Sequence, residues 1–276
     1  MRAPKALVLT GYGLNCDYET HYALEQAGAI AHRVHINQVI GGFGKKISLL
    51  DYQIFVLGGG FSWADDHGAG VLMANKLREY LKEEIERFLE QGGLAIGICN
   101  GFQGFVNLGI LPGLNGDYFT RKVALIGNDK GNFINTWVKL RINPKSPCVF
   151  TRGMEYIELP VRHAEGKFYT TQDVLKELKT NQQVVMTYAA DKDKDAQGRW
   201  PLNPNGSLDD IAGICDPTGR VFGLMPHPEA YHHFTNHPLW TRKYEAYKRG
   251  LGENPEKEPN GLYIFKNAVE YAKENL

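Results

Sequence analysis

The chain has 276 residues, of which 43% are hydrophobic and 22% charged, so it can bury a large core as one large domain or two small ones. Its 31 Lys and Arg residues balance its 31 Asp and Glu residues, and no basic block indicates a nucleic acid or a membrane surface as a partner. No apolar run approaches the ~20 residues of a membrane span, and the N-terminal residues lack the pattern of a signal peptide.

The four cysteines, Cys16, Cys99, Cys148 and Cys215, are far apart in the sequence. None of them stands at the C-x-x-C spacing of a zinc site, so we expect no metal in this chain. Unpaired cysteines favour a reducing compartment, and we expect the cytoplasm.

The first hundred residues alternate between apolar runs and amphipathic segments. Strands are expected over 6–10, 30–36, 53–57 and 94–98. Helices are expected over 18–26, with Asp17 as the N-cap, and over 69–91, where every third or fourth residue is apolar. This alternation predicts a doubly wound α/β fold with a mostly parallel sheet. In such folds the functional site lies at the carboxyl ends of the strands.

The pattern changes after about residue 122. Strands with little helix between them are expected over 123–126, 133–142, 156–161, 184–189, 211–215 and 221–224. They predict a strand-rich, antiparallel segment, interrupted by an exposed excursion over 191–206. Two helices, over 238–249 and 261–274, end the chain. We therefore expect one domain over 1–232 and a helical extension over 233–276 that packs on it.

One stretch carries the strongest chemical signal. Leu94–Ile98 is a short apolar run, and Gly97-Ile98-Cys99-Asn100-Gly101 then places a cysteine where G-x-S-x-G places the serine of a nucleophile elbow. A helix that begins there would offer free N–H groups and partial positive charge, which activate a thiol. Cys99 is therefore the candidate nucleophile rather than a structural cysteine.

Two other stretches supply candidate partners for this cysteine. In Met225-Pro226-His227-Pro228-Glu229, proline favours an extended chain, so His227 and Glu229 should point to the same side, as a base and the carboxylate that orients it. Gly58-Gly59-Gly60 ends the strand over 53–57 and is either a tight turn or a backbone donor for a ligand oxygen. The glycine-rich stretch 41–46 does not match a phosphate loop, and we find no other nucleotide fingerprint.

These motifs resemble those of the class I (triad) glutamine amidotransferases. Cys99-Asn100-Gly101-Phe102-Gln103 resembles the C-x-G-x-Q nucleophile motif, and His227-Pro228-Glu229 resembles the H-x-E motif. Gly59-Gly60-Phe61-Ser62 and Asn203-Pro204-Asn205-Gly206-Ser207 resemble one branch of the family, the glutaminase subunit of phosphoribosylformylglycinamidine synthase. The chain departs from the family at Phe102 and at Ala230, where a small residue or Cys and an Arg are usual.

The resemblance implies a flavodoxin-like amidotransferase fold and a glutaminase with Cys99, His227 and Glu229 as its triad. It also implies that the backbone N–H groups of Gly60 and Asn100 form the oxyanion hole, and that Gly59 and Gln103 contact L-glutamine. The ammonia would pass to a synthetase subunit that uses ATP and Mg²⁺ to amidinate formylglycinamide ribonucleotide, with a small accessory subunit. This chain itself would need no cofactor.

Alternatives stay open at this point. The chain could be another α/β cysteine hydrolase, such as a γ-glutamyl peptidase or a DJ-1-like protein, or a regulatory module that has kept an amidotransferase fold. The segment His163-Ala164-Glu165-Gly166 is either a strand-end turn or part of the site, and we assign it no catalytic role. The loop 203–207 is either a plain turn or, as we favour, a surface that faces a partner.

Overall fold

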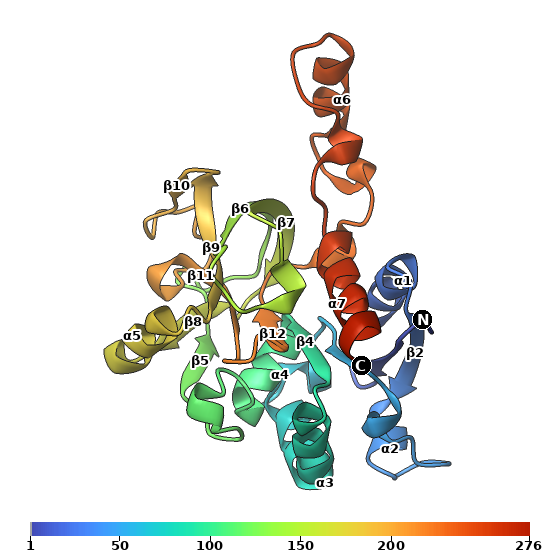
Figure 1. Cartoon of the computed structure of the whole chain (residues 1–276). Coiled ribbons are helices and arrows are strands. Elements are labelled where there is room, and N and C mark those ends of the chain that lie inside the picture. The colour runs from blue at the N-terminus through green and yellow to red at the C-terminus, as the bar shows by residue number, and fades with distance from the viewer. Residues whose placement is uncertain (1) are drawn as a thin grey trace.

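The computed structural model describes residues 2–276 and is built around one large sheet, shown in Figure 1. The strands of this sheet lie in the order β2-β1-β3-β4-β12-β11-β9-β6-β7, with β10 paired to β9. Their bounds are β1 (Lys5–Thr10), β2 (Ile30–His35), β3 (Ile54–Leu57), β4 (Leu94–Ile98), β6 (Ile134–Ile142), β7 (Tyr156–His163), β9 (Val184–Asp191), β10 (Lys194–Asp195), β11 (Ile211–Cys215) and β12 (Val221–Leu224). A separate antiparallel pair consists of β5 (Val123–Ile126) and β8 (Lys167–Thr170).

The sheet changes character at its middle. From β2 to β12 neighbouring strands run parallel, and from β12 to β7 they run antiparallel. The predicted α/β class is confirmed, and most of the predicted antiparallel segment continues the same sheet, while β5 lies in the separate pair with β8. The parallel strands β1, β3, β4 and β12 are almost wholly buried and apolar, as expected for strands covered on both faces.

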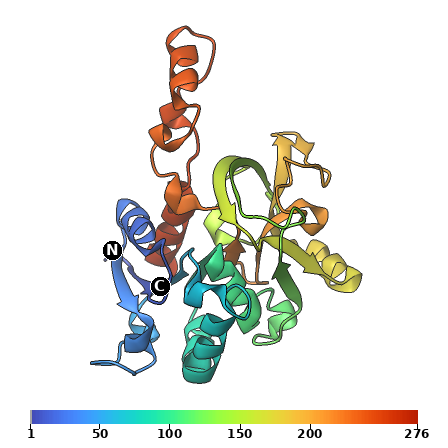
Figure 2. The ribbon, with the colours of Figure 1, turned by 180° about the vertical axis from the view of Figure 1, so that it is seen from behind.

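Helices cover both faces of the parallel half. The helices are α1 (Asp17–Gln26), α2 (Ile36–Val39), α3 (Val71–Glu90), α4 (Asn100–Leu108), α5 (Gln172–Thr180), α6 (Trp240–Lys248) and α7 (Leu262–Asn275). The crossovers from β1 to β2 and from β3 to β4 step outward in opposite directions, so right-handed connections place α1 and α3 on opposite faces. Helix α7 packs beside α1, and α4 packs beside α3 (Figures 1 and 2).

Most of the predicted elements are present, and the differences have local causes. The apolar stripe of α3 is buried as predicted, with Met73, Leu77, Leu81, Ile85 and Phe88 in the core. The prediction that Asp17 caps α1 is wrong: the N-cap is Cys16 without a side-chain cap bond, and Asp17 pairs with Arg33 at 3.2 Å. Strand β8 and helix α5 had no counterpart among the predicted elements, because both are short and lie between stronger signals.

The last part of the chain leaves the body and returns to it. Helix α6 has no buried residue and lies on an arm that projects beyond the rest of the molecule, as both ribbon views show (Figures 1 and 2). Helix α7 buries Ile264, Phe265 and Val269 against the body. The domain boundary at residue 232 stays a prediction. Within the part of the chain that the structure describes, no helix has both the length and the apolar composition to cross a bilayer.

Candidate active site

Cys99 occupies a sharp turn between β4 and α4. Its backbone has φ 52° and ψ −106°, a strained conformation for a residue other than glycine, and its N–H donates to Leu224 O at 2.8 Å. The flanking glycines are needed for steric reasons: a Cβ on Gly97 would lie 2.7 Å from Gly101 O, and a Cβ on Gly101 would lie 1.9 Å from Leu57 O. Residues 97–101 therefore form the predicted elbow.

The sheet brings His227 to this elbow. Strands β4 and β12 are parallel neighbours, with Ile98 opposite Leu224, so Cys99 and the residues after Leu224 leave the sheet at the same edge. The His227 Nδ1 lies 2.5 Å from Glu229 Oε1, and both side chains are buried. The predicted meeting of these two side chains is confirmed, but for a different reason. His227 is extended as predicted, but Pro228–Ala230 form a 3-10 turn that brings the Glu229 side chain back to the imidazole.

The electrostatics of this group favour a charged imidazole beside the thiol. Burial opposes ionisation of His227, but the Glu229 carboxylate, and after it the negative charge of an ionised Cys99, raise the pKa of His227 well above its ordinary value. An imidazolium beside a cysteine stabilises the thiolate, which is the nucleophilic form. The pKa of Cys16, a second thiol near this histidine, is raised chiefly by burial, so Cys16 stays protonated.

The glycine run after β3 lies against the histidine. A Cβ on Gly59 would come within 2.6 Å of His227 Cε1 and 3.2 Å of Cys16 Sγ, so only glycine fits there. Gly60 has φ 150° and packs against the loop after β1, where a Cβ would lie 2.3 Å from Gly13 O. Gly59 is therefore in contact with the candidate base, and its contact with substrate stays a prediction, as do the oxyanion roles of Gly60 and Asn100.

Asn100 and Gln103 extend the site along the first turn of α4. The Asn100 Oδ1 accepts from Ser62 N–H at 3.2 Å, and its Nδ2 donates to Asp65 Oδ1 at 2.9 Å and to Gln103 Oε1 at 3.0 Å. The Gln103 Nε2 donates to Glu165 O, and its side chain is buried. Both amides therefore hold the walls of the site, and the substrate contact of Gln103 stays a prediction.

The segment 162–166, at the end of β7, covers the nucleophile. The Cys99 Sγ donates to Arg162 O at 3.6 Å, and Glu165 Oε2 accepts from Ala69 N–H at 3.2 Å. His163 is buried, its Nδ1 lies 3.2 Å from Asn128 Oδ1, and burial followed by the charge of His227 lowers its pKa to about 3. His163 is therefore a neutral structural side chain at physiological pH.

Three residues near the reacting groups were missed by the sequence analysis: Cys16, Asp65 and Arg162. The Cys16 thiol follows β1, which neighbours β3, so the strand-end rule could have found it once the strand order was known. Asp65 lies in a short turn after the glycine run, and burial, with a smaller effect from Glu165, raises its pKa to about 6. Arg162 contributes only its carbonyl oxygen to Cys99, for which side-chain motifs give no signal.

Unpaired polar atoms concentrate here. Among residues 2–276, the buried side-chain atoms without a protein hydrogen-bond partner are Ser62 Oγ, Arg162 Nε, His163 Nε2, His227 Nε2 and Glu229 Oε2. All belong to residues of this site or its walls, and unpaired buried polar atoms cost free energy, so their concentration at one place is typical of a functional site. Cys16, His227 and Glu229 also offer donor atoms within 4.8 Å of one another, which a metal ion could use. The expected absence of a metal stays a prediction.

Comparisons with known proteins agree with this geometry. Residues 3–272 match the family described as CobB/CobQ-like glutamine amidotransferase domain. The chain is 45% identical over 268 residues to the phosphoribosylformylglycinamidine synthase subunit PurQ of Methanococcus maripaludis, with 97% of each chain covered. It is 44% identical to the same subunit of Dehalococcoides mccartyi, covering 99% of this chain and 100% of the other. A chain in the structure of PurLQS from Thermotoga maritima superposes with a TM-score of 0.67 and 29% identity, covering 98% and 99% of the two chains.

Proposed function

The chain belongs to the CobB/CobQ-like glutamine amidotransferase family and, within it, to the PurQ subunits of phosphoribosylformylglycinamidine synthase, and we propose that Cys99, His227 and Glu229 are its catalytic triad. As a member of that family the chain is the glutaminase subunit of this synthase and acts in purine biosynthesis. One observation carries the triad: a buried imidazole bound at 2.5 Å to a buried carboxylate beside a cysteine in a strained elbow.

The first half of the reaction forms a thioester. The Cys99 thiolate attacks the side-chain amide carbon of L-glutamine, and the amide oxygen becomes an oxyanion. His227, held by Glu229, carries the thiol proton and returns it to the amide nitrogen, so that the C–N bond breaks and ammonia leaves. The Glu229 carboxylate remains ionised and stabilises the imidazolium.

The oxyanion needs donors fixed at the elbow. The N–H of Asn100 lies at the start of α4, and the N–H of Gly60 lies in the glycine run beside His227; we assign the oxyanion to these two groups. Each such donor contributes on the order of 3 kcal/mol to the transition state. A water molecule, deprotonated by His227, then attacks the thioester carbon and releases glutamate and the Cys99 thiol.

The ammonia serves a second subunit. We assign the ATP- and Mg²⁺-dependent amidination of formylglycinamide ribonucleotide to a synthetase subunit, assisted by a small accessory subunit. The likeness to a chain of the PurLQS structure supports this assembly. The four cysteines are free and buried, which agrees with a cytoplasmic location.

A labelling experiment tests the triad without the partner. A glutamine-like diazo-ketone should alkylate Cys99 alone, and peptide mass mapping locates the label. The His227→Ala variant should be labelled more slowly, because the thiolate loses its counter-charge. Label on Cys16, Cys148 or Cys215 with Cys99 unmodified would refute the assignment of the nucleophile.

A further inference from the structure

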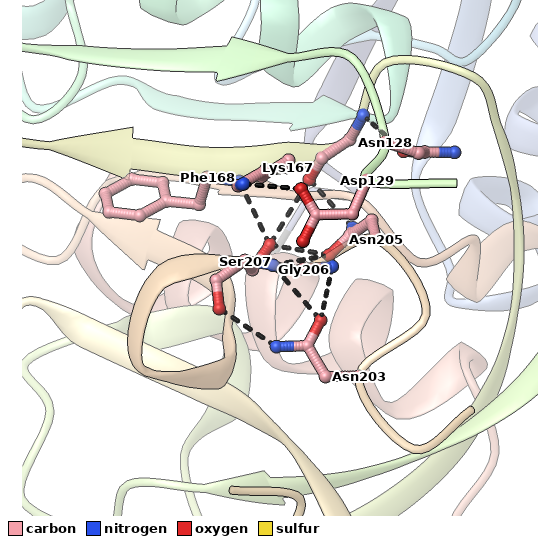
Figure 3. A network of polar contacts seen from close by, with 9 residues as sticks. Asn128, Asp129, Lys167, Phe168, Asn203, Asn205, Gly206 and Ser207 are labelled. Carbon is pink, nitrogen blue, oxygen red and sulfur yellow. Dashed lines mark hydrogen bonds and ion pairs between the residues drawn. The ribbon is translucent and has the colours of Figure 1, made fainter. Parts of the chain in front are cut away.

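The loop Asn203–Ser207 is buried, although its polar and glycine-rich sequence suggested a turn or a partner-facing surface. Asn203, Asn205 and Ser207 are at most 3% exposed, and Figure 3 shows that their side chains belong to one network of polar contacts. The favoured partner-facing role is therefore wrong for these three side chains. Buried amides and hydroxyls are costly unless they form hydrogen bonds, so their partners indicate what the loop does.

The three side chains divide into two groups by their partners. Asn203 closes the loop: its Oδ1 accepts from Gly206 N–H at 2.9 Å and Ser207 N–H at 3.1 Å, and its Nδ2 donates to Ser207 O at 2.9 Å and to Asp210 Oδ1, just beyond the loop, at 2.8 Å. Asn205 and Ser207 bond each other, with Ser207 Oγ donating to Asn205 Oδ1 at 2.7 Å, and both also reach a distant part of the chain. A plain turn would need only the contacts of Asn203, so the outward contacts require a separate explanation.

The outward contacts end on segment 162–168, which consists of the stretch 162–166 that covers the nucleophile and the first two residues of β8. Asn205 Nδ2 donates to Gly166 O at 2.8 Å. Ser207 Oγ accepts from Phe168 N–H at 3.0 Å, as Figure 3 shows. From the other side, Asn128 Nδ2 donates to His163 O at 2.9 Å and its Oδ1 accepts from Gly166 N–H at 3.1 Å. Segment 162–168 is therefore fixed by side chains from two separate loops.

The same segment contacts the reacting groups on its other side. Arg162 O accepts from the Cys99 thiol at 3.6 Å, and Glu165 O accepts from Gln103 Nε2. Asn205 Nδ2 also donates to the hydroxyl of Tyr188 at 3.0 Å. Burial raises the pKa of Tyr188, the hydrogen bond from Asn205 opposes this rise, and the charge of an ionised Cys99 adds to it.

We propose that Asn205 and Ser207 are positioning residues for the glutaminase reaction: they fix segment 162–168 so that the Arg162 and Glu165 carbonyls hold Cys99 and Gln103 in place. This inference rests on the proposed function of Cys99 and extends it to a loop that does not touch the triad. A displacement of about 1 Å at a reacting group can cost on the order of 100-fold in rate, so even a small movement of this segment matters.

The test compares Asn205→Ala with a matched control, Gln183→Ala. Gln183 is also fully buried, and its Nε2 donates two bonds, to Pro112 O and Cys215 O, each at 2.8 Å, at the opposite end of β11. In the complex with the synthetase and accessory subunits, we expect the glutaminase kcat/KM of Asn205→Ala to fall by about 10- to 100-fold. Gln183→Ala should keep its glutaminase activity, although urea unfolding should show that it loses about as much stability as Asn205→Ala. Equal activity in the two variants would overturn the proposal.

A second readout separates positioning from general loosening. Arg162 O contacts the Cys99 thiol and Glu165 O contacts Gln103, so a shift of their segment displaces the nucleophile. The rate at which the glutamine-like diazo-ketone alkylates Cys99, measured in the isolated chain at one pH, should therefore fall in Asn205→Ala and stay unchanged in Gln183→Ala. An unchanged rate in both variants would contradict the proposal.

Conservative variants keep the test valid if Asn205→Ala does not fold. Asn205→Asp keeps the shape but cannot donate to Gly166 O, so it should lose activity as well. Ser207→Ala should lose activity, and Ser207→Thr, which keeps the hydroxyl acceptor for Phe168 N–H, should restore most of it. Failure of the proposed function is a different result: it would appear as glutamine hydrolysis that survives in Cys99→Ala, whatever Asn205 does.

Discussion

Gly101→Ala tests whether the steric fit of the elbow sets the position of the nucleophile. The added Cβ would lie 1.9 Å from Leu57 O and 2.5 Å from Leu57 C, both backbone atoms of β3. Contacts under 3.0 Å are essentially never seen for a real Cβ, so helix α4 and β3 must separate by about 1 Å. Because Cys99 immediately precedes α4, the thiol must move with the helix.

The expected magnitude follows from this displacement. Overpacking against backbone costs about 1–3 kcal/mol of stability, and a movement of 1 Å at a nucleophile costs on the order of 100-fold in rate. Gly104→Ala is the matched control on the same helix, since the one close contact of its Cβ would be with the flexible end of Met73, at 2.5 Å, and Leu57 Cδ1 lies at an ordinary 3.5 Å. Replacing glycine by alanine inside a helix is worth about 1 kcal/mol, which should offset that contact.

The assay combines urea unfolding with steady-state glutaminase rates in the complex. Gly101→Ala should unfold at a clearly lower urea concentration and lose most of its kcat, whereas Gly104→Ala should resemble the wild type in both. If Gly101→Ala matched Gly104→Ala in stability and rate, the close approach of α4 to β3 would not be what positions Cys99.

Three further predictions concern the charged groups and the partner. His227→Ala should reduce glutaminase activity to background in steady-state assays. Glu229→Gln should keep a measurable fraction of the activity, because Glu229 orients the base without transferring the proton. Full activity in His227→Ala would rule out His227 as the base. Burial raises the pKa of the Asp65 carboxyl to about 6, so the folded state binds the carboxyl proton more tightly than the unfolded state does. The wild type should therefore lose stability as the pH rises from about 4 to 6. Asp65→Asn should therefore gain stability over the wild type across that window and keep the gain above pH 6 in urea unfolding; a constant difference from pH 4 to 8 would contradict the raised pKa. Glycine populates several backbone conformations readily, so we expect the run Gly58–Gly60 to change conformation when the partner docks. Addition of the synthetase, ATP and acceptor should then raise the glutaminase rate at least ~10-fold, about 1.4 kcal/mol, and an isolated chain as fast as the complex would exclude this activation.

The elements nearest to the nucleophile were predictable because their signals are local. The apolar run Leu94–Ile98, the glycines around Cys99 and the motif that holds His227 and Glu229 each lie within a few residues of one another. The alternation of strands and helices before residue 100 also fixed the class of the fold, and hence the sheet edge at which the site lies.

The remaining features depend on contacts between distant segments. The position of Cys16 beside His227 follows from the strand order β1-β3-β4-β12, which the local patterns do not contain. The loop 203–207 looked like an exposed turn because asparagine, glycine and proline are typical of turns. Its burial depends on the backbone of Gly166 and Phe168, some 40 residues earlier in the chain.

The most direct test of the central claim uses the Cys99→Ala variant in a reconstituted complex with the synthetase and accessory subunits. With ATP and formylglycinamide ribonucleotide, ammonium salt should support formation of formylglycinamidine ribonucleotide at the wild-type rate, because the synthetase site is intact. L-Glutamine should support none, because the thioester cannot form. If this complex still used glutamine, Cys99 would not be the nucleophile that supplies the ammonia.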